Sequence, residues 1–159
     1  MTPRILTISL LSLVSLVLAN DIVPQQFGGC EFPEMELAVT PEDCQRGLMF
    51  RQDVPATGGM LFVFPEERER HFWMKNTLVP LDIVFLDSQG AIVSISQMLP
   101  EPPRRPEETE DAYEARLTSY PSQFPARYAI ELRAGMAAYL QLQPGDVLPL
   151  NLPSAKDAK

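Results

Sequence analysis

Residues 71–82 combine a cation, an amide, a hydroxyl and a carboxylate with large apolar side chains. A strand or turn that buries the aromatic residues also removes water from their polar neighbours, so those groups need hydrogen-bonding partners. The partners are either other groups of the protein, as in a structural network, or a bound ligand. The candidate ligand-binding residues in and near this segment are Arg51, Trp73, Lys75, Asn76, Thr77 and Asp82.

Two carboxylates, Asp82 and Glu131, are candidates for acid–base catalysis because each interrupts an otherwise apolar strand pattern. Placed at one site, they would support a metal-independent hydrolase or lyase, with Lys75 stabilising developing negative charge. The competing interpretation, which we favour, is that each carboxylate accepts hydrogen bonds from arginines or from the backbone. The sequence therefore assigns no catalytic residue and favours a protein that is not an enzyme.

Arg51 and Trp73 each have a functional and a structural interpretation. Arg51 could clamp a carboxylate, a phosphate or a sugar acid, or it could stabilise the end of a preceding helix. Trp73 could stack on a sugar ring, or it could belong to the hydrophobic core. The structural interpretation is favoured for both residues.

Several function classes are disfavoured by composition. The single histidine, His71, leaves little scope for a histidine-dependent nucleophile site, and no glycine-rich phosphate loop is present. The formal net charge of −8 opposes binding to nucleic acid or to an anionic membrane surface. We expect no metal and no cofactor.

The N-terminal segment indicates export. Residues 1–19 have the pattern of a cleavable signal peptide that ends at Ala19, and their apolar run is shorter than the roughly 20 residues of a membrane-spanning helix. We expect a secreted or periplasmic protein without a membrane segment after cleavage, the alternative being an uncleaved anchor. In an exported chain, Cys30 and Cys44 are expected to form a disulfide, the alternatives being two reduced thiols or part of a metal site with His71.

The hydrophobic pattern predicts a single α+β domain, built on a compact, mostly antiparallel, barrel-like β-sheet with two or three short helices. The domain is expected over residues 35–152, after a flexible leader at 20–34 and before a frayed tail at 153–159. An exposed insertion is expected at 99–123. The predicted strands are residues 35–39, 60–64, 82–86, 91–96, 127–132 and 146–150, and the predicted helices are residues 41–50, 107–117 and 134–140.

Five ordered motifs carry a resemblance to a known family. They are GLMFR at 47–51, GMLFVF at 59–64, FWMKNT at 72–77, PLDI at 80–83, and PARY at 125–128 followed by EL at 131–132 and AG at 134–135. This pattern resembles the domain-of-unknown-function 192 family, also called uncharacterised protein family 0127. The resemblance implies a compact β-rich fold and no established reaction. Its recurring polar residues fall on Arg51, Lys75, Asn76, Thr77, Asp82 and Glu131.

The leading hypothesis is an exported, non-enzymatic binding or accessory module. Its polar cleft beside Trp73 would take a small anionic or carbohydrate ligand of the cell envelope. The alternatives are the hydrolase or lyase with paired carboxylates and a purely structural role for the polar residues. The chain departs from the family pattern in the long segment 101–119, which could reshape the mouth of a pocket. The oligomeric state is open.

Overall fold

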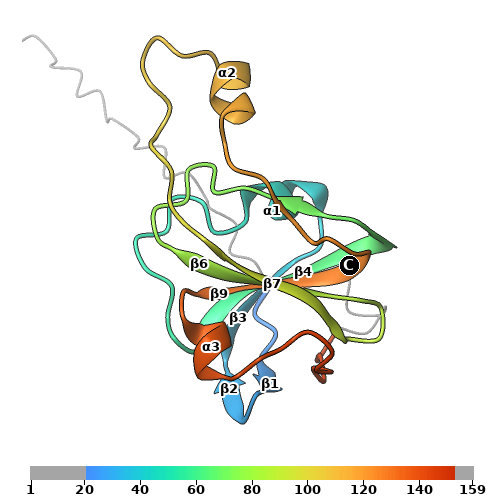
Figure 1. The fold of residues 1–159 in the computed structure, drawn as a ribbon. Helices are drawn as coiled ribbons and strands as arrows, with labels where there is room; N and C mark the ends of the chain where they lie inside the picture. The colour runs from blue at the N-terminus through green and yellow to red at the C-terminus, as the bar shows by residue number, and fades with distance from the viewer. Residues whose placement is uncertain (1–20, 153–159) are drawn as a thin grey trace, which may run out of the picture.

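The computed structural model describes residues 21–152, which are organised around a five-stranded sheet with the strand order β3-β4-β9-β6-β7 (Figure 1). A hairpin, β1-β2, and a two-stranded ribbon, β5-β8, accompany this sheet. The strands are β1 Gln25–Phe27, β2 Cys30–Phe32, β3 Glu34–Ala38, β4 Gly58–Arg68, β5 His71–Phe72, β6 Leu81–Leu86, β7 Ile92–Met98, β8 Tyr120–Pro121 and β9 Ala126–Arg133. The helices are α1 Pro41–Arg46, α2 Glu110–Ala115 and α3 Met136–Tyr139.

The predicted α+β class is confirmed, and the sheet is mostly antiparallel. Only β3 and β4 pair in parallel, while β4-β9, β9-β6 and β6-β7 are antiparallel. Within the described residues the sheet does not close into a barrel. Its two edges are covered instead by neighbouring chain, because Val23 donates to Met35 on the β3 side and Ile92 donates to Asp146 on the β7 side.

Alternation along the strands divides the core into two clusters on opposite faces of the sheet. Leu61, Val84 and Ile130 share one ladder position and one face, which also contacts the β1-β2 hairpin and α3. The next ladder position, with Met60 and Ile83, belongs to the other face, toward α1. Because successive side chains of a strand point to opposite faces, the register fixes the face of every polar residue within these strands.

Two segments differ from the sequence-based expectations. The predicted flexible leader contains the β1-β2 hairpin, whose Phe27 and Phe32 are buried and stack with their ring centroids 4.5 Å apart. Apolar burial therefore orders this segment. The helix expected to end at residue 50 ends at Arg46, because Gly47 adopts a positive φ of 48° and its N–H caps the carbonyl of Asp43 at 2.8 Å.

The remaining elements lie close to their predicted positions, with three exceptions. Strand β4 continues past Pro65 to Arg68, and α3 is shorter than predicted. Residues 146–150 form no strand and contribute one isolated bridge, Ala91 with Val147. The two ends of the described domain meet, since the Gln25 side chain donates to the Asn151 carbonyl at 2.7 Å and accepts from its N–H at 2.8 Å.

The insertion predicted at 99–123 carries α2, which stands away from the sheet at the end of a long strap (Figure 1). The insertion is not exposed along its whole length, because Tyr113 is 1% exposed and Ser122 is completely buried. The strap returns to the sheet through β8, which pairs with β5.

The predicted disulfide is not formed in this structure, where Cys30 and Cys44 are both free. Cys30 packs against the core cluster on the α3 face, and Cys44 packs against the cluster on the α1 face. The sheet therefore separates the two thiols. Burial raises the pKa of the Cys44 thiol to about 11, so this cysteine remains protonated near neutral pH.

Within residues 21–152, no helix has the length and apolar character that a membrane crossing requires. The predicted signal peptide at 1–19 and the predicted tail at 153–159 lie outside the described residues.

Candidate functional site

Glu131 is a buried acidic residue in the middle of the central strand β9. It lies on the α1 face, across from Met60 on β4 and Ile83 on β6, and is 5% exposed. Its Oε2 atom has no hydrogen-bond partner among the described residues. Gly47 faces this oxygen, and a Cβ atom added there would lie 3.6 Å from it. The glycine that ends α1 therefore leaves space above the carboxyl group.

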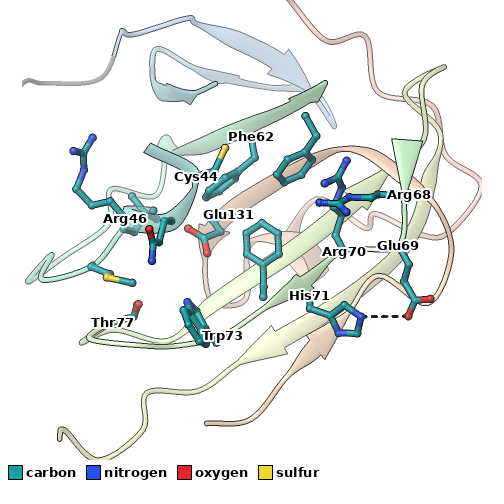
Figure 2. A pocket seen from close by; sticks show the side chains of 16 residues that line it. Cys44, Arg46, Phe62, Arg68, Glu69, Arg70, His71, Trp73, Thr77 and Glu131 are labelled. Atoms are coloured by element: carbon teal, nitrogen blue, oxygen red, sulfur yellow. Dashed lines mark ion pairs between the residues drawn. The ribbon is translucent and has the colours of Figure 1, made fainter. Parts of the chain in front are cut away.

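Glu131 borders a cavity of about 410 Å³ between α1, β4 and the chain around β5. Figure 2 shows its carboxyl group among Phe62, Thr77 and Trp73. Aromatic side chains form much of the wall, and the Phe62 and Phe72 rings meet edge to face with centroids 5.0 Å apart. The cavity thus combines an apolar wall with one unpartnered polar atom, a combination typical of small-molecule sites.

Burial raises the pKa of Glu131 to about 8, far above the ordinary value of 4.5. At neutral pH this carboxyl group is therefore mainly protonated. A neutral carboxyl group can donate one hydrogen bond and accept others. It can hold an uncharged hydroxyl, amide or carbonyl group of a ligand, and it can donate a proton at near-neutral pH.

Three arginines, Arg46, Arg68 and Arg70, also border the cavity, Arg46 on one side and the other two across from it in Figure 2. Arg70 is 9% exposed, donates to the Ala126 carbonyl at 3.3 Å and to the Glu66 carbonyl, and lies 4.1 Å above the centre of the Phe64 ring. Burial, followed by repulsion from Arg68, lowers the Arg70 pKa. The rim of the cavity therefore carries three arginines and one exposed carboxylate, Glu69, whereas the buried carboxyl group of Glu131 is mainly uncharged at neutral pH.

His71 also borders the cavity but is exposed and lies 3.7 Å from the Glu69 carboxylate. Its Nδ1 atom is 3.1 Å from the Ser119 hydroxyl. These contacts place the histidine at the solvent edge. Within residues 21–152, no three or more histidine, cysteine, aspartate or glutamate side chains are grouped so that they could hold a metal ion.

Of the predicted ligand-binding residues, Trp73 and Thr77 border the Glu131 cavity. Thr77 is 7% exposed and its hydroxyl donates to the Lys75 carbonyl at 3.1 Å, which fixes the turn that carries it. Trp73 has the Lys75 ammonium 5.5 Å from its ring centre. Both residues are positioned by the FWMKNT segment.

Lys75 and Asn76 contact the insertion instead of the cavity. The Lys75 ammonium pairs with Glu114 at 2.5 Å and with Glu110, and these hydrogen bonds raise its pKa. Asn76 has a positive φ of 51°, and its N–H donates to the Tyr113 hydroxyl at 3.2 Å. These two residues hold α2 against the turn that carries them.

Arg51 and Asp82 lie away from the Glu131 cavity. Arg51 pairs with Glu36 at 2.7 Å beside a separate hollow near the start of β4. Asp82 shares a ladder position with Leu132, so it points to the α3 face of the sheet, where its Oδ2 accepts from the Ala137 N–H at 2.9 Å. The single cleft expected from the sequence is therefore not assembled from these six residues.

The two candidate catalytic carboxylates are on opposite faces of the sheet. Glu131 pairs with Ile83 across the β6-β9 ladder, and Asp82 is the neighbouring residue on β6. Neighbouring residues of a strand point in opposite directions. Asp82 and Glu131 are thus not brought together to act on one substrate.

Sequence reasoning missed Gly47 and Arg70. Gly47 was visible as the first residue of GLMFR, and a glycine after a short helix is a recognisable terminator. Arg70 lies in the charged segment 66–70, whose composition is typical of exposed chain, and only the structure shows that Arg70 is buried and lies over the Phe64 ring.

The fold defines a small α+β domain, and among its described residues Glu131 borders a cavity with aromatic residues in its wall and arginines at its rim. By family, the chain belongs to DUF192, described as "Uncharacterized ACR", whose model matches residues 24–150. No curated protein matches the chain.

Solved structures that are similar to this chain include one from Novosphingobium and one from Sinorhizobium. The crystal structure of a protein of unknown function from Novosphingobium aromaticivorans DSM 12444 has 29% identity and a TM-score of 0.69, over 85% of this chain and 89% of that one. The other, from Sinorhizobium meliloti 1021, is described as a suggested transcription regulator. It has 35% identity and a TM-score of 0.59, over 79% of this chain and 88% of that one.

Proposed function

We propose that this protein is a non-enzymatic binding module whose small ligand enters the cavity beside Glu131. The observation that carries this proposal is the unpartnered Oε2 atom of a 5% exposed carboxyl group at the wall of that cavity. A buried polar group without a partner costs about 1–3 kcal/mol, so a ligand that hydrogen-bonds it gains affinity by removing that cost.

The ligand is expected to be amphipathic. Its apolar part would contact the aromatic wall around Phe62, Phe72 and Trp73. Its uncharged polar group would bond the protonated Glu131, and the positive rim favours a negatively charged end. This combination keeps the small anionic or sugar-derived ligand expected from the sequence and moves its site from Arg51, Lys75 and Asp82 to the Glu131 cavity.

The signal-like pattern of residues 1–19 supports a location outside the cytoplasm. The ligand is then a molecule of the cell envelope or of the medium. The similar Sinorhizobium protein is described as a suggested transcription regulator, so an alternative function for this chain is the binding of nucleic acid. The net charge of −8 weighs against that alternative, because phosphate contacts need a basic surface.

A thermal-shift screen of the full chain tests the proposal, with sugars, sugar acids, aromatic acids and peptidoglycan fragments as probes. Binding raises the melting temperature in a concentration-dependent way. A ligand of the cavity should stabilise the wild type and lose most of this effect in Glu131→Leu, which replaces the polar group and fills space. The matched control is Glu107→Leu, on the exposed part of the insertion. A ligand that stabilises all three proteins equally binds elsewhere and contradicts the proposal.

A further inference from the structure

A second hollow, of about 510 Å³, adjoins the Glu131 cavity and shares Cys44, Phe64, Arg68 and Arg70 with it. Its own wall adds one more arginine, Arg127. The remainder is mostly apolar, and one acidic residue, Glu66, also borders it. These additional residues are Val39, Pro41, Val63, Pro65 and Glu66.

The pairing of β4 with β9, which is irregular between Val63 and Arg68, brings Arg68 and Arg127 to the same end of the sheet. Arg68, the last residue of β4, is the ladder partner of Ala126 at the start of β9, so Arg127 follows directly on the neighbouring strand. Arg70 returns toward the same place, because its guanidinium donates to the Ala126 carbonyl at 3.3 Å. The positive charges of Arg68 and Arg127 both act on Arg70 and lower its pKa, beyond the effect of burial, while Glu66 opposes them.

These three arginines lack the partners that other arginines of the chain have. Within residues 21–152, none of the three forms an ion pair with a carboxylate. The guanidinium hydrogen bonds of Arg70 and Arg127 go to neutral main-chain carbonyls of residues 65, 66 and 126. Of the six other arginines in residues 21–152, five lie within 4.0 Å of a carboxylate, namely Arg46, Arg51, Arg104, Arg116 and Arg133, and the sixth, Arg105, lies in the exposed strap. In a chain with 21 acidic and 13 basic residues, three neighbouring arginines without a carboxylate ion pair are unusual.

We propose that Arg68, Arg70 and Arg127 form an oxyanion-binding site for a small molecule with an apolar body. This inference rests on the proposed function and extends it, since the oxyanion would be the charged end of the ligand whose uncharged group reaches Glu131. Guanidinium groups bind phosphate, sulfate and carboxylate oxygens through paired N–H donors. Phe64 and Pro65 offer the apolar surface for the body next to the charge.

Isothermal titration of the full chain with phenyl phosphate, benzoate, inorganic phosphate and neutral benzyl alcohol tests this site. Phenyl phosphate carries a phosphate and benzoate a carboxylate, so comparing the two shows which type of oxyanion the site prefers. At least one aromatic anion should bind more tightly than both inorganic phosphate and benzyl alcohol, because it alone uses the arginines and the apolar wall. Its affinity should fall as the salt concentration rises.

Arg68→Ala is the main variant, because Arg68 is exposed and its removal breaks no hydrogen bond of the described structure. Affinity for the aromatic anion should fall about tenfold, the loss expected for one charge-assisted contact. Arg127→Ala should have a similar effect if the variant keeps its wild-type circular dichroism. The matched control is Arg133→Ala, which removes an arginine from the other end of β9 and should leave the affinity unchanged.

The outcomes separate this inference from the function on which it rests. No binding of either aromatic anion at millimolar concentration, or an equal loss in Arg133→Ala and Arg68→Ala, overturns the oxyanion site. A ligand from the thermal-shift screen that depends on Glu131 but not on Arg68 or Arg127 also overturns it and leaves the proposed function standing. Binding of phenyl phosphate or benzoate that depends on Arg68 supports the oxyanion site whether or not Glu131→Leu changes it, because neither probe has an uncharged group for Glu131, and the thermal-shift screen tests the Glu131 function separately.

Discussion

The two faces of the central sheet each bury one acidic residue, and the two residues have different surroundings. On the α3 face, Asp82 accepts a hydrogen bond from the Ala137 N–H at 2.9 Å. On the α1 face, one ladder position away, Glu131 has an Oε2 atom without a partner among the described residues. Asp82 thus joins α3 to the sheet, whereas Glu131 does nothing for stability that the structure reveals. A buried acid that stabilises nothing is the better candidate for a ligand contact.

The largest expected effect is a pH dependence of stability that comes from Glu131. The pKa of Glu131 is about 8 in the folded protein and near 4.5 in the unfolded chain. Between pH 4.5 and pH 8, folding is therefore accompanied by the uptake of one proton. The free energy of unfolding is therefore independent of Glu131 titration below pH 4.5, and it decreases by about 1.4 kcal/mol per pH unit as the pH rises toward 8. Urea unfolding of the full chain at several pH values measures this slope.

Glu131→Gln provides the control, because it removes the titration and keeps the shape of the side chain. The difference in unfolding free energy between wild type and this variant should change steadily from pH 5 to pH 8. If the difference instead stays constant from pH 5 to pH 8, Glu131 is already ionised in the folded protein. The proposed contrast between Glu131 and Asp82 would then be wrong.

Asp82→Ala should have the next largest effect. The change removes a buried charge-assisted hydrogen bond and leaves the Ala137 N–H without its acceptor, at a cost of about 3 kcal/mol in unfolding free energy. Chemical denaturation at pH 7 is the measurement.

Glu131→Leu under the same conditions should lower the unfolding free energy less than Asp82→Ala does, or even raise it, because an unpartnered polar group is replaced by an apolar one. Equal losses in both variants would contradict the division of roles.

Lys75→Met should have a smaller effect that is confined to the α1 face and the insertion. It removes the ion pairs with Glu110 and Glu114, at a cost of about 1 kcal/mol. Hydrogen exchange should quicken in α2 and leave the Ala137 N–H on the α3 face protected. Faster exchange on both faces would mean that Lys75 supports the whole fold.

The sequence predicted the sheet well and the site poorly, for an identifiable reason. The strands at residues 82–86 and 91–96 were predicted from their own apolar residues and from the turn residues between them. Both strands and the hairpin that joins them are confirmed. The roles of Lys75 and Asp82 depend instead on residues 30 or more positions away, namely Glu110, Glu114 and Ala137. Residue type alone does not reveal which of several possible partners a polar group finds.

Register was the missing information for the two carboxylates. Asp82 and Glu131 were expected as a possible pair because both interrupt apolar strands. A shift of one residue in the β6-β9 pairing would have placed them on the same face. Only the three-dimensional pairing, with Asp82 across from Leu132, separates them.

Arg51→Ala should have the smallest effect of all. Its guanidinium pairs with Glu36 and the side chain is 46% exposed, so the unfolding free energy should change by less than about 0.5 kcal/mol. Affinity for a ligand of the Glu131 cavity should not change, since Arg51 borders a different hollow. A large loss of affinity in this variant would instead support the single polar cleft that the sequence predicted.

The meeting of the domain's two ends has a consequence for engineering. The reciprocal hydrogen bonds between Gln25 and Asn151 bring the first and last parts of the described domain together. A short glycine-rich linker can therefore join the two ends, and the chain can be reopened in the exposed strap at 102–106. Such a circular permutant would begin and end beside α2, and a reporter group attached there would respond to movement of the strap.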